Sequence, residues 1–249
     1  MGNLNTVKNY YDEFWKDNNL EKQKSSDLRD YEKEARKFIY DFLINYFGDF
    51  KNKKILEIGL GEGHDLIEFA KMGANVTGID ISENSLKKSR KLALKNKLKV
   101  KLINMDAHNL KFKKNQFDIV FIISTLMHLD YLKAINECKK VMKKNGVLYL
   151  IEPINNNLLI KFYRLFFSEF KDLKPRYLKY TDLVKISKNF NKSYIKVFYL
   201  FSFLSLVFRN NSFIYYKLSK NFKLIEENIL KIMPSLERNC WLSVSIHLK

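Results

Sequence analysis

Residues 54–64, Lys54-Ile55-Leu56-Glu57-Ile58-Gly59-Leu60-Gly61-Glu62-Gly63-His64, decide how this chain folds. They read as a short apolar strand, a turn with glycine at every second position, and the start of a helix at His64. Glycine adopts positive φ without steric cost and lets a ligand approach the backbone closely. The first turn of a helix also leaves backbone N–H groups without intrahelical partners. The stretch therefore predicts a cradle for a ligand.

On the C-terminal side of this stretch, short apolar runs alternate with longer helical patterns. The runs are rich in β-branched and aromatic residues and mostly lack polar alternation, as expected of strands buried on both faces. The expected strands are 55–58, 76–79, 100–103, 117–123 and 147–151, and the expected helices are 64–72, 83–96 and 130–143. This order predicts an α/β fold with a mostly parallel sheet and helices on both faces.

The flanking regions are less regular. Residues 1–47 have helical spacing and end at Gly48. Beyond Pro153 we expect a helix capped by Thr181, a strand near 193–200 and an amphipathic helix over 213–232, followed by a terminal strand within 240–249.

Acidic residues follow two of the predicted strands. Asp80 stands twenty-one positions after Gly59, and Asp106 follows the third strand. In open α/β sheets ligands bind at the carboxyl ends of the strands, so both carboxylates and Ser124 should meet the glycine turn there. The spacing G-x-G-x-G departs from the G-x-G-x-x-G of dinucleotide sites and disfavours a nicotinamide dehydrogenase.

Five stretches in order, LEIGLGEG, VTGIDIS, INMDAHNLKF, FDIVFIISTLMHL and CKKVMKKNGVLYLIEP, resemble the class I S-adenosylmethionine-dependent methyltransferases of the small-molecule type. The resemblance covers roughly residues 50–153. It implies a Rossmann-like, seven-stranded, mostly parallel sheet with a reversed terminal strand, and S-adenosylmethionine as the cofactor. Within a single domain it implies a helical lid (1–47), a cofactor-binding core (48–153) and a C-terminal completion with an apolar, acceptor-side insertion (154–249).

The resemblance also implies roles for individual residues. The methionine end of the cofactor would be held by Glu57, Gly59, Gly61 and Gly63, and the ribose by Asp80. The adenine would lie against Ile81, Asp106 and Ala107, and the sulfur would lie near Ser124. At 144–146 the chain has Lys-Asn-Gly where the family usually has Pro-Gly-Gly. Because asparagine tolerates left-handed geometry, we expect that turn to be kept.

Aromatic residues of the N-terminal helix are candidates for the substrate side. By resemblance to the family's lid helix, Tyr10, Tyr11 and Trp15 would line the pocket, although plain helix packing explains such a stripe equally well.

A general base is needed only if the methyl acceptor must lose a proton. His128 is the first candidate because imidazole titrates near neutral pH, and Glu152 is the second. A capping or packing role for His128, and a loop-orienting role for Glu152, are the competing interpretations. His64 is expected to shape the cradle.

The composition narrows the choice of partners. The formal net charge is +18, but the excess is mainly lysine spread along the chain, so we expect a solvated surface and no nucleic-acid partner. Two distant cysteines and four scattered histidines predict neither a disulfide framework nor a metal site. The sequence lacks an export signal and fits a reducing cytoplasm. No pattern in it predicts an oligomeric state.

The segment Val197–Phe208, VFYLFSFLSLVF, carries no charge. As a helix it would rise about 18 Å, short of the roughly 30 Å of a bilayer core, so it must be core or interface. Its surroundings resemble methyltransferases with an apolar C-terminal elaboration, which implies a small, lipid-like or isoprenoid acceptor and peripheral membrane contact. The alternatives are an ordinary buried segment, a non-catalytic S-adenosylmethionine-binding subunit or sensor, and an RNA-directed methyltransferase.

Overall fold

The strands form one seven-stranded sheet in the order β3-β2-β1-β4-β5-β7-β6. The computed structural model describes residues 4–16, 28–167, 173, 175–208 and 211–249. The strands are β1 (Lys54–Ile58), β2 (Asn75–Asp80), β3 (Lys101–Asn104), β4 (Phe117–Ile123), β5 (Met142–Pro153), β6 (Lys192–Phe198) and β7 (Leu242–Leu248).

The predicted sheet is confirmed, including its reversed terminal strand. β1 to β5 pair in parallel, whereas β7 runs antiparallel to both β5 and β6 between them. Apart from Leu248 at its end, every residue of β7 is buried. The parallel strands place the carboxyl ends of β1, β2, β3 and β4 at one edge of the sheet, where the glycine turn and the acidic residues follow.

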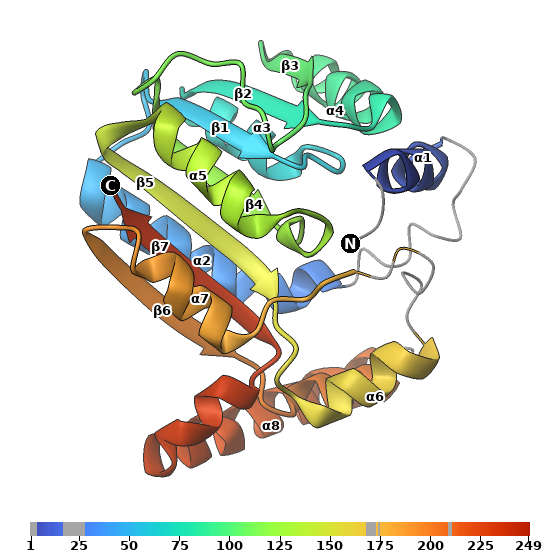
Figure 1. The fold of residues 1–249 in the computed structure, drawn as a ribbon. Coiled ribbons are helices and arrows are strands. Elements are labelled where there is room, and N and C mark those ends of the chain that lie inside the picture. Colours follow the sequence, from blue (N-terminus) through green and yellow to red (C-terminus); the bar gives the residue numbers. More distant parts are fainter. Residues whose placement is uncertain (1–3, 17–27, 168–172, 174, 209–210) are drawn as a thin grey trace.

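Helices cover both faces of the sheet (Figure 1). One face packs against α2 (Leu28–Phe47), α3 (His64–Lys71) and α4 (Glu83–Lys95) through residues such as Ile39, Leu43 and Phe69. The other packs against α5 (Tyr131–Val141) and α7 (Tyr180–Ser187). Two apolar cores therefore sandwich the strands, as in a doubly wound α/β fold.

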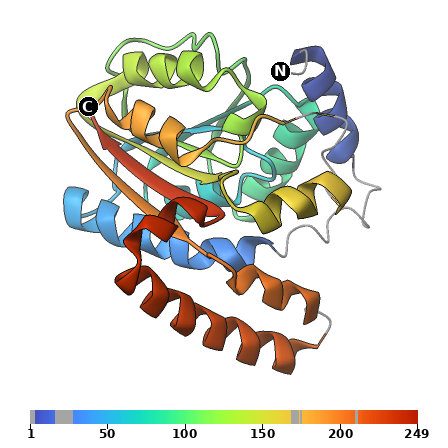
Figure 2. The same ribbon diagram turned by 60° about the horizontal axis from the view of Figure 1, so that its bottom comes forward.

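Two further groups of helices lie at opposite ends of the molecule. α1 (Leu4–Phe14) lies beside α4, whereas α6 (Leu158–Phe167), η4 (Ser202–Phe208), α8 (Ser212–Ile232) and η5 (Pro234–Asn239) gather at the other end (Figures 1 and 2). The Asn157 side-chain amide, just before α6, donates to the carbonyls of Leu200 and Asn239, each at 2.7 Å. This amide joins three segments that are far apart in the sequence.

Most helix boundaries follow local signals. Ser82 caps α4, Asp130 caps α5, and Gly48, at φ +77°, ends α2. The predicted cap at Thr181 is wrong by two residues. Lys179 holds the cap position, because the Asp182 carboxylate accepts the Lys179 N–H at 2.9 Å and lets the helix begin at Tyr180.

The expected turn at 144–146 is kept, because the chain folds back so that a Cβ at Gly146 would stand 3.2 Å from the Lys143 backbone nitrogen. β5 begins at Met142 directly after α5, and Asn145 does not adopt positive φ. Between the pairs Phe117–Met142 and Ile119–Val147 the register of β4 and β5 shifts, so the extra residues form a bulge. The turn is therefore accommodated within β5 as a bulge between two residue pairs with β4.

The apolar segment Val197–Phe208 is divided between the interior and the surface. Tyr199 and Phe203 are buried in the core beneath α2, whereas Val207 is 78% exposed and Phe208 45%. The expectation of a buried segment is thus confirmed for its first part, and an interface at Val207 and Phe208 stays a prediction. None of the helices in the described ranges is long and apolar enough to cross a membrane.

Candidate functional site

The turn between β1 and α3 is built from three glycines with positive φ. Gly59 lies at φ +78°, Gly61 at +53° and Gly63 at +77°. A Cβ at Gly59 would stand 2.2 Å from Thr125 Oγ1, and one at Gly63 would stand 2.7 Å from Ser89 Oγ. The glycines are therefore required both by backbone conformation and by close packing against neighbouring elements.

Asp80, at the end of β2, holds this turn in place. Its Oδ2 accepts the Leu60 N–H at 2.9 Å and the Ser85 hydroxyl at 2.8 Å, and its Oδ1 accepts the Ser82 N–H at 2.8 Å. Burial raises the pKa of the Asp80 carboxyl, and these hydrogen bonds oppose that rise. Each carboxylate oxygen accepts about two hydrogen bonds, so Oδ1 retains capacity for a ligand hydroxyl.

Glu57, on β1 just before the turn, is a buried carboxylate with one unsatisfied oxygen. It is 3% exposed, and among the described residues its Oε2 has no hydrogen-bond partner. Burial raises the pKa of Glu57 well above its usual range, while the positive charge of Arg36 on α2 opposes the rise. Arg36 itself pairs with Asp65 at the start of α3. A buried acceptor of this kind suits a cationic ligand group.

Asp106 lies at the same sheet edge as Asp80. The Met105 N–H donates to the Asp80 carbonyl at 3.2 Å, so the two acidic residues follow neighbouring strands. Asp106 Oδ1 accepts the His108 N–H at 2.9 Å and lies 2.7 Å from His108 Nδ1. Because His108 Nε2 accepts the Asp130 N–H at 2.9 Å, the ring proton must be on Nδ1, pointing to Asp106. This tautomer fixes the Asp106 carboxylate.

Glu152 anchors the loop after β4. It is fully buried, and its Oε1 accepts the backbone N–H groups of both Thr125 and Leu126 at 3.0 Å. Ser124, which precedes Thr125, has φ +49°, and its N–H donates to the Ile151 carbonyl at 2.8 Å. These contacts favour the loop-orienting interpretation of Glu152.

α1 covers the glycine turn and the start of α4. Asp12 Oδ1 accepts the Ser82 hydroxyl at 2.7 Å, and the Asp12 carbonyl accepts the Asn84 side-chain amide at 2.7 Å. Trp15 lies against the turn, since a Cβ at Gly61 would stand 3.3 Å from its ring. The N-terminal helix is thus fastened to the elements that carry Asp80.

Tyr11 of α1 meets His128 of η2 (Leu126–His128) across this end of the sheet. The Tyr11 hydroxyl lies 2.8 Å from His128 Nε2. Burial lowers the pKa of His128 to about 4 and raises that of Tyr11, so both groups are neutral near pH 7. The pair links the helix to the loop that Glu152 anchors.

The other predicted residues lie around the same edge. The Ile81 carbonyl accepts the Asn104 side-chain amide at 3.0 Å, and Ala107 is 5% exposed. Tyr10 packs edge-to-face on Tyr11. His64 contacts Glu62 at 2.9 Å on the exposed side of the turn.

Sequence reasoning missed four contributors: Asp12, Arg36, Ser85 and His108. Asp12, Arg36 and Ser85 act through partners that the folded chain brings near, so no local pattern marks these three residues. His108 is the exception, because it stands two residues after Asp106 and could have been considered as its partner. No cluster of three or more metal-ligating side chains occurs in the described part of the chain.

Comparison with known proteins finds methyltransferases. The family described as "Methyltransferase domain" matches residues 56–150. The ubiquinone biosynthesis O-methyltransferase of Pelagibacter ubique is 31% identical over 59% of this chain and 64% of that protein. The demethylmenaquinone methyltransferase of Staphylococcus aureus is 35% identical over 47% of this chain and 51% of that protein. The matches thus span about half to two thirds of these relatives.

One solved structure shows the same fold at lower identity. It is phosphoethanolamine N-methyltransferase 2 of Haemonchus contortus, in complex with phosphomonomethylethanolamine and S-adenosylhomocysteine. It is 19% identical, with a TM-score of 0.60, over 83% of this chain and 51% of that one. This likeness concerns the fold alone.

Proposed function

We propose that this chain, whose residues 56–150 are a methyltransferase domain of the class I S-adenosylmethionine-dependent family, transfers a methyl group to a small, lipid-like acceptor. One observation carries the proposal: the glycine turn, Asp80 and Asp106 converge at one sheet edge beneath α1. A nucleoside with a charged tail is the ligand class that such an edge accommodates.

The residues present suit the cofactor of this family. The unsatisfied Glu57 Oε2 would accept its ammonium group, Asp80 Oδ1 a ribose hydroxyl, and Asp106, beside Ala107, the adenine amine. Ile81 would pack against the adenine, and the Ser124 backbone would lie near the sulfur. When bound, S-adenosylmethionine supplies an electrophilic methyl group on a sulfonium.

The chain's own contribution to catalysis is mainly positional. The N–H groups at the start of α3 and the Glu152-anchored loop fix one wall, and α1 closes over it and excludes water. If the acceptor carries an acidic O–H or C–H, neutral His128 would be the candidate to take the proton, and the Tyr11 hydroxyl would orient its ring. Tyr10 and Trp15 would add apolar walls from the same helix.

A lipid-like acceptor is supported by two separate observations. Of the relatives described above, one is named as a ubiquinone biosynthesis O-methyltransferase and the other as a demethylmenaquinone methyltransferase. In addition, the end of the molecule opposite α4 exposes a set of large apolar side chains, which we name the C-terminal apolar surface. Its members are Leu158, Leu159 and Phe162 on α6, Leu204, Val207 and Phe208 on η4, and Phe213 and Tyr216 on α8.

We assign the C-terminal apolar surface to contact with an anionic membrane. Phe162 is 62% exposed and Phe213 75%, which is unusual for phenylalanine facing water. The exposed cations Lys161, Lys217 and Lys220 stand on the same helices, so acidic lipid headgroups would complement them. A membrane-bound acceptor could then be taken from the surface on which the protein rests.

The activity is tested with labelled cofactor and a quinone-precursor lipid extract. We expect label to move into the lipid fraction, and Asp106→Ala to weaken S-adenosylhomocysteine binding in calorimetry. Asp49→Ala, an exposed carboxylate before β1, is the matched control. Binding without label transfer would instead support the non-catalytic alternative, transfer to RNA the RNA-directed one, and no binding heat would refute the cofactor assignment.

The membrane assignment is tested by flotation with vesicles of phosphatidylcholine alone or with phosphatidylglycerol. Wild type should float only with the anionic vesicles, and Phe162→Ser/Phe213→Ser should not float. Leu94→Ser/Leu132→Ser, two exposed leucines far from this surface, should float like wild type. Equal flotation of both double variants would contradict the assignment.

A further inference from the structure

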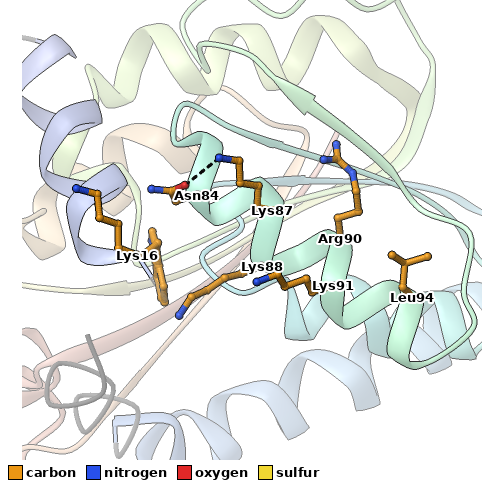
Figure 3. A pocket seen from close by; sticks show the side chains of 8 residues that line it. Lys16, Asn84, Lys87, Lys88, Arg90, Lys91 and Leu94 are labelled. Carbon is orange, nitrogen blue, oxygen red and sulfur yellow. Dashed lines mark hydrogen bonds between the residues drawn. The ribbon is translucent and has the colours of Figure 1, made fainter. Parts of the chain in front are cut away.

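A groove separate from the cofactor edge lies between the end of α1 and the exposed face of α4 (Figure 3). We name it the α4 groove. Its volume, about 390 Å³, falls in the size class of small-molecule sites. It is lined by Trp15, Lys16, Asn84, Lys87, Lys88, Arg90, Lys91 and Leu94.

The α4 groove is strongly cationic. Five of its eight lining side chains are lysine or arginine, and none is a carboxylate. Lys88 Nζ lies 3.6 Å from Glu62, and Lys16 pairs with Glu13. Within the described ranges, by contrast, no carboxylate pairs with Lys87 or Arg90. The groove therefore keeps positive charge that its own surroundings do not neutralise.

This charge disfavours the helix that carries it. Lys87 stands three residues from Arg90 and four from Lys91, so like charges adjoin on the surface of α4. Like charges at this spacing destabilise a helix. An anion bound among these side chains would remove the repulsion.

We propose that the α4 groove binds a small anion with more than one phosphoryl group, of the pyrophosphate class. Residues 87 to 91 cover about 6 Å of helix rise, which suits consecutive phosphoryl groups better than a single one. Arg90 offers a planar fork of N–H donors and Lys87 a mobile point charge. Figure 3 shows these two toward one side of α4, with Lys88 and Lys91 toward the other.

The bound anion would also hold α1 closed, a consequence that rests on the proposed function. Lys16 follows the end of α1 by two residues and the other four cations belong to α4, so an anion between them would bridge the two segments. Lys88 Nζ already lies 5.3 Å from the centre of the Trp15 ring, which in turn lies against Gly61. Anion binding should therefore strengthen cofactor retention, and the coupling should be reciprocal.

The groove is distinct from the proposed membrane contact. α4 lies at the opposite end of the molecule from α6 and α8, so a membrane under the C-terminal apolar surface does not reach it (Figure 1). Its volume of about 390 Å³ also favours a small ligand over a nucleic-acid strand, which would require a longer cationic track.

Calorimetry with pyrophosphate at low salt tests the site. Wild type should bind, and Lys87→Ala/Arg90→Ala should bind at least about tenfold more weakly. Both positions are exposed and alanine favours helix, so folding is not at risk. Lys113→Ala/Lys114→Ala removes the same charge from an exposed loop and should bind within about twofold of wild type.

Three outcomes would overturn the proposal: no heat with pyrophosphate, equal weakening in both double variants, or groove-dependent binding seen only with single-stranded RNA or phosphatidylglycerol vesicles. A second titration separates this proposal from the function. Pyrophosphate should tighten S-adenosylhomocysteine binding to wild type and not to Lys87→Ala/Arg90→Ala. If pyrophosphate leaves the affinity for S-adenosylhomocysteine unchanged, the bridging of α1 is refuted. If S-adenosylhomocysteine does not bind at all, the proposed function is refuted.

Discussion

At the scale of single residues, the site depends on groups whose conformation or protonation is fixed by their neighbours. Asp80 accepts donors from the glycine turn and from the start of α4, so one carboxylate sets the relative position of both. Tyr11 and His128 remain neutral because they are buried. Changes at such positions should affect ligand binding through geometry more than through charge.

Gly59→Ala should weaken nucleoside binding strongly. The substitution combines a positive φ with a Cβ only 2.2 Å from Thr125 Oγ1, so the turn or the Glu152-anchored loop must move. We expect S-adenosylhomocysteine affinity to fall at least about tenfold by calorimetry. Gly48→Ala has φ +77° but no atom within 4 Å of its Cβ, so it controls for backbone strain alone. Similar affinities in the two variants would contradict the prediction.

Because His128 is buried in its neutral form, the protein should be less stable in mild acid than at neutral pH. The folded pKa of His128 is lowered from 6.5 to about 4, so between these values the unfolded chain binds a proton that the folded chain does not. The free energy of unfolding therefore falls as pH drops from 6.5 to 4, by roughly 1–3 kcal/mol for this group.

His128→Gln should remove that part of the pH dependence in urea unfolding. His247, whose pKa burial also lowers to about 4, provides the comparison, and His247→Gln should flatten the profile similarly. An unchanged slope in His128→Gln would show that its imidazole titrates freely in the folded state.

At the scale of elements, the loop between β4 and α5 depends on the strand beside it. The two N–H groups at Thr125 and Leu126 have no acceptor in their own segment and reach Glu152 on β5. The register of β4 against β5 therefore determines where the loop lies.

Glu152→Ala should destabilise the protein by about 2–4 kcal/mol, because it leaves two buried donors unsatisfied. Glu152→Gln keeps an acceptor oxygen at the same place and should recover most of the stability in thermal unfolding. If Glu152 orients the loop, the glutamine variant should also keep most of the methyl-transfer rate. A stable glutamine variant without turnover would identify Glu152 as a proton acceptor instead.

At the scale of the whole molecule, the two ends of the chain differ in importance for folding. β7 pairs with β5 on one side and β6 on the other, and its side chains are almost entirely buried. α1 contributes one fully buried apolar residue, Val7, and is otherwise fastened by polar contacts.

Removing residues 240–249 should therefore abolish cooperative unfolding, because β5 and β6 lose their shared partner. Removing residues 1–16 should leave a cooperative transition and near-native circular dichroism but weaken S-adenosylhomocysteine binding at least about tenfold. Nucleoside affinity equal to that of the full chain would show that α1 is not a lid.

The sequence by itself determined the parallel strands, the helices between them and the residues that follow the strand ends, whereas the reversed last strand was implied only by the resemblance to the family. These features follow from local causes: apolar runs long enough for buried strands, glycines at positions of positive φ, and side chains that cap helices. Parallel strands then bring Gly59, Asp80 and Asp106 to one edge, whatever the details of packing.

Only the tertiary structure decided the contacts between distant segments. The Asp12 link to α4, the Tyr11–His128 pair and the Arg36–Asp65 pair each join residues that no local pattern relates. Pairing with β4 on both sides of residues 143–146 also decided that the turn lies inside β5 as a bulge. Such contacts depend on how distant segments pack in the folded chain, so the local sequence around each residue does not predict them.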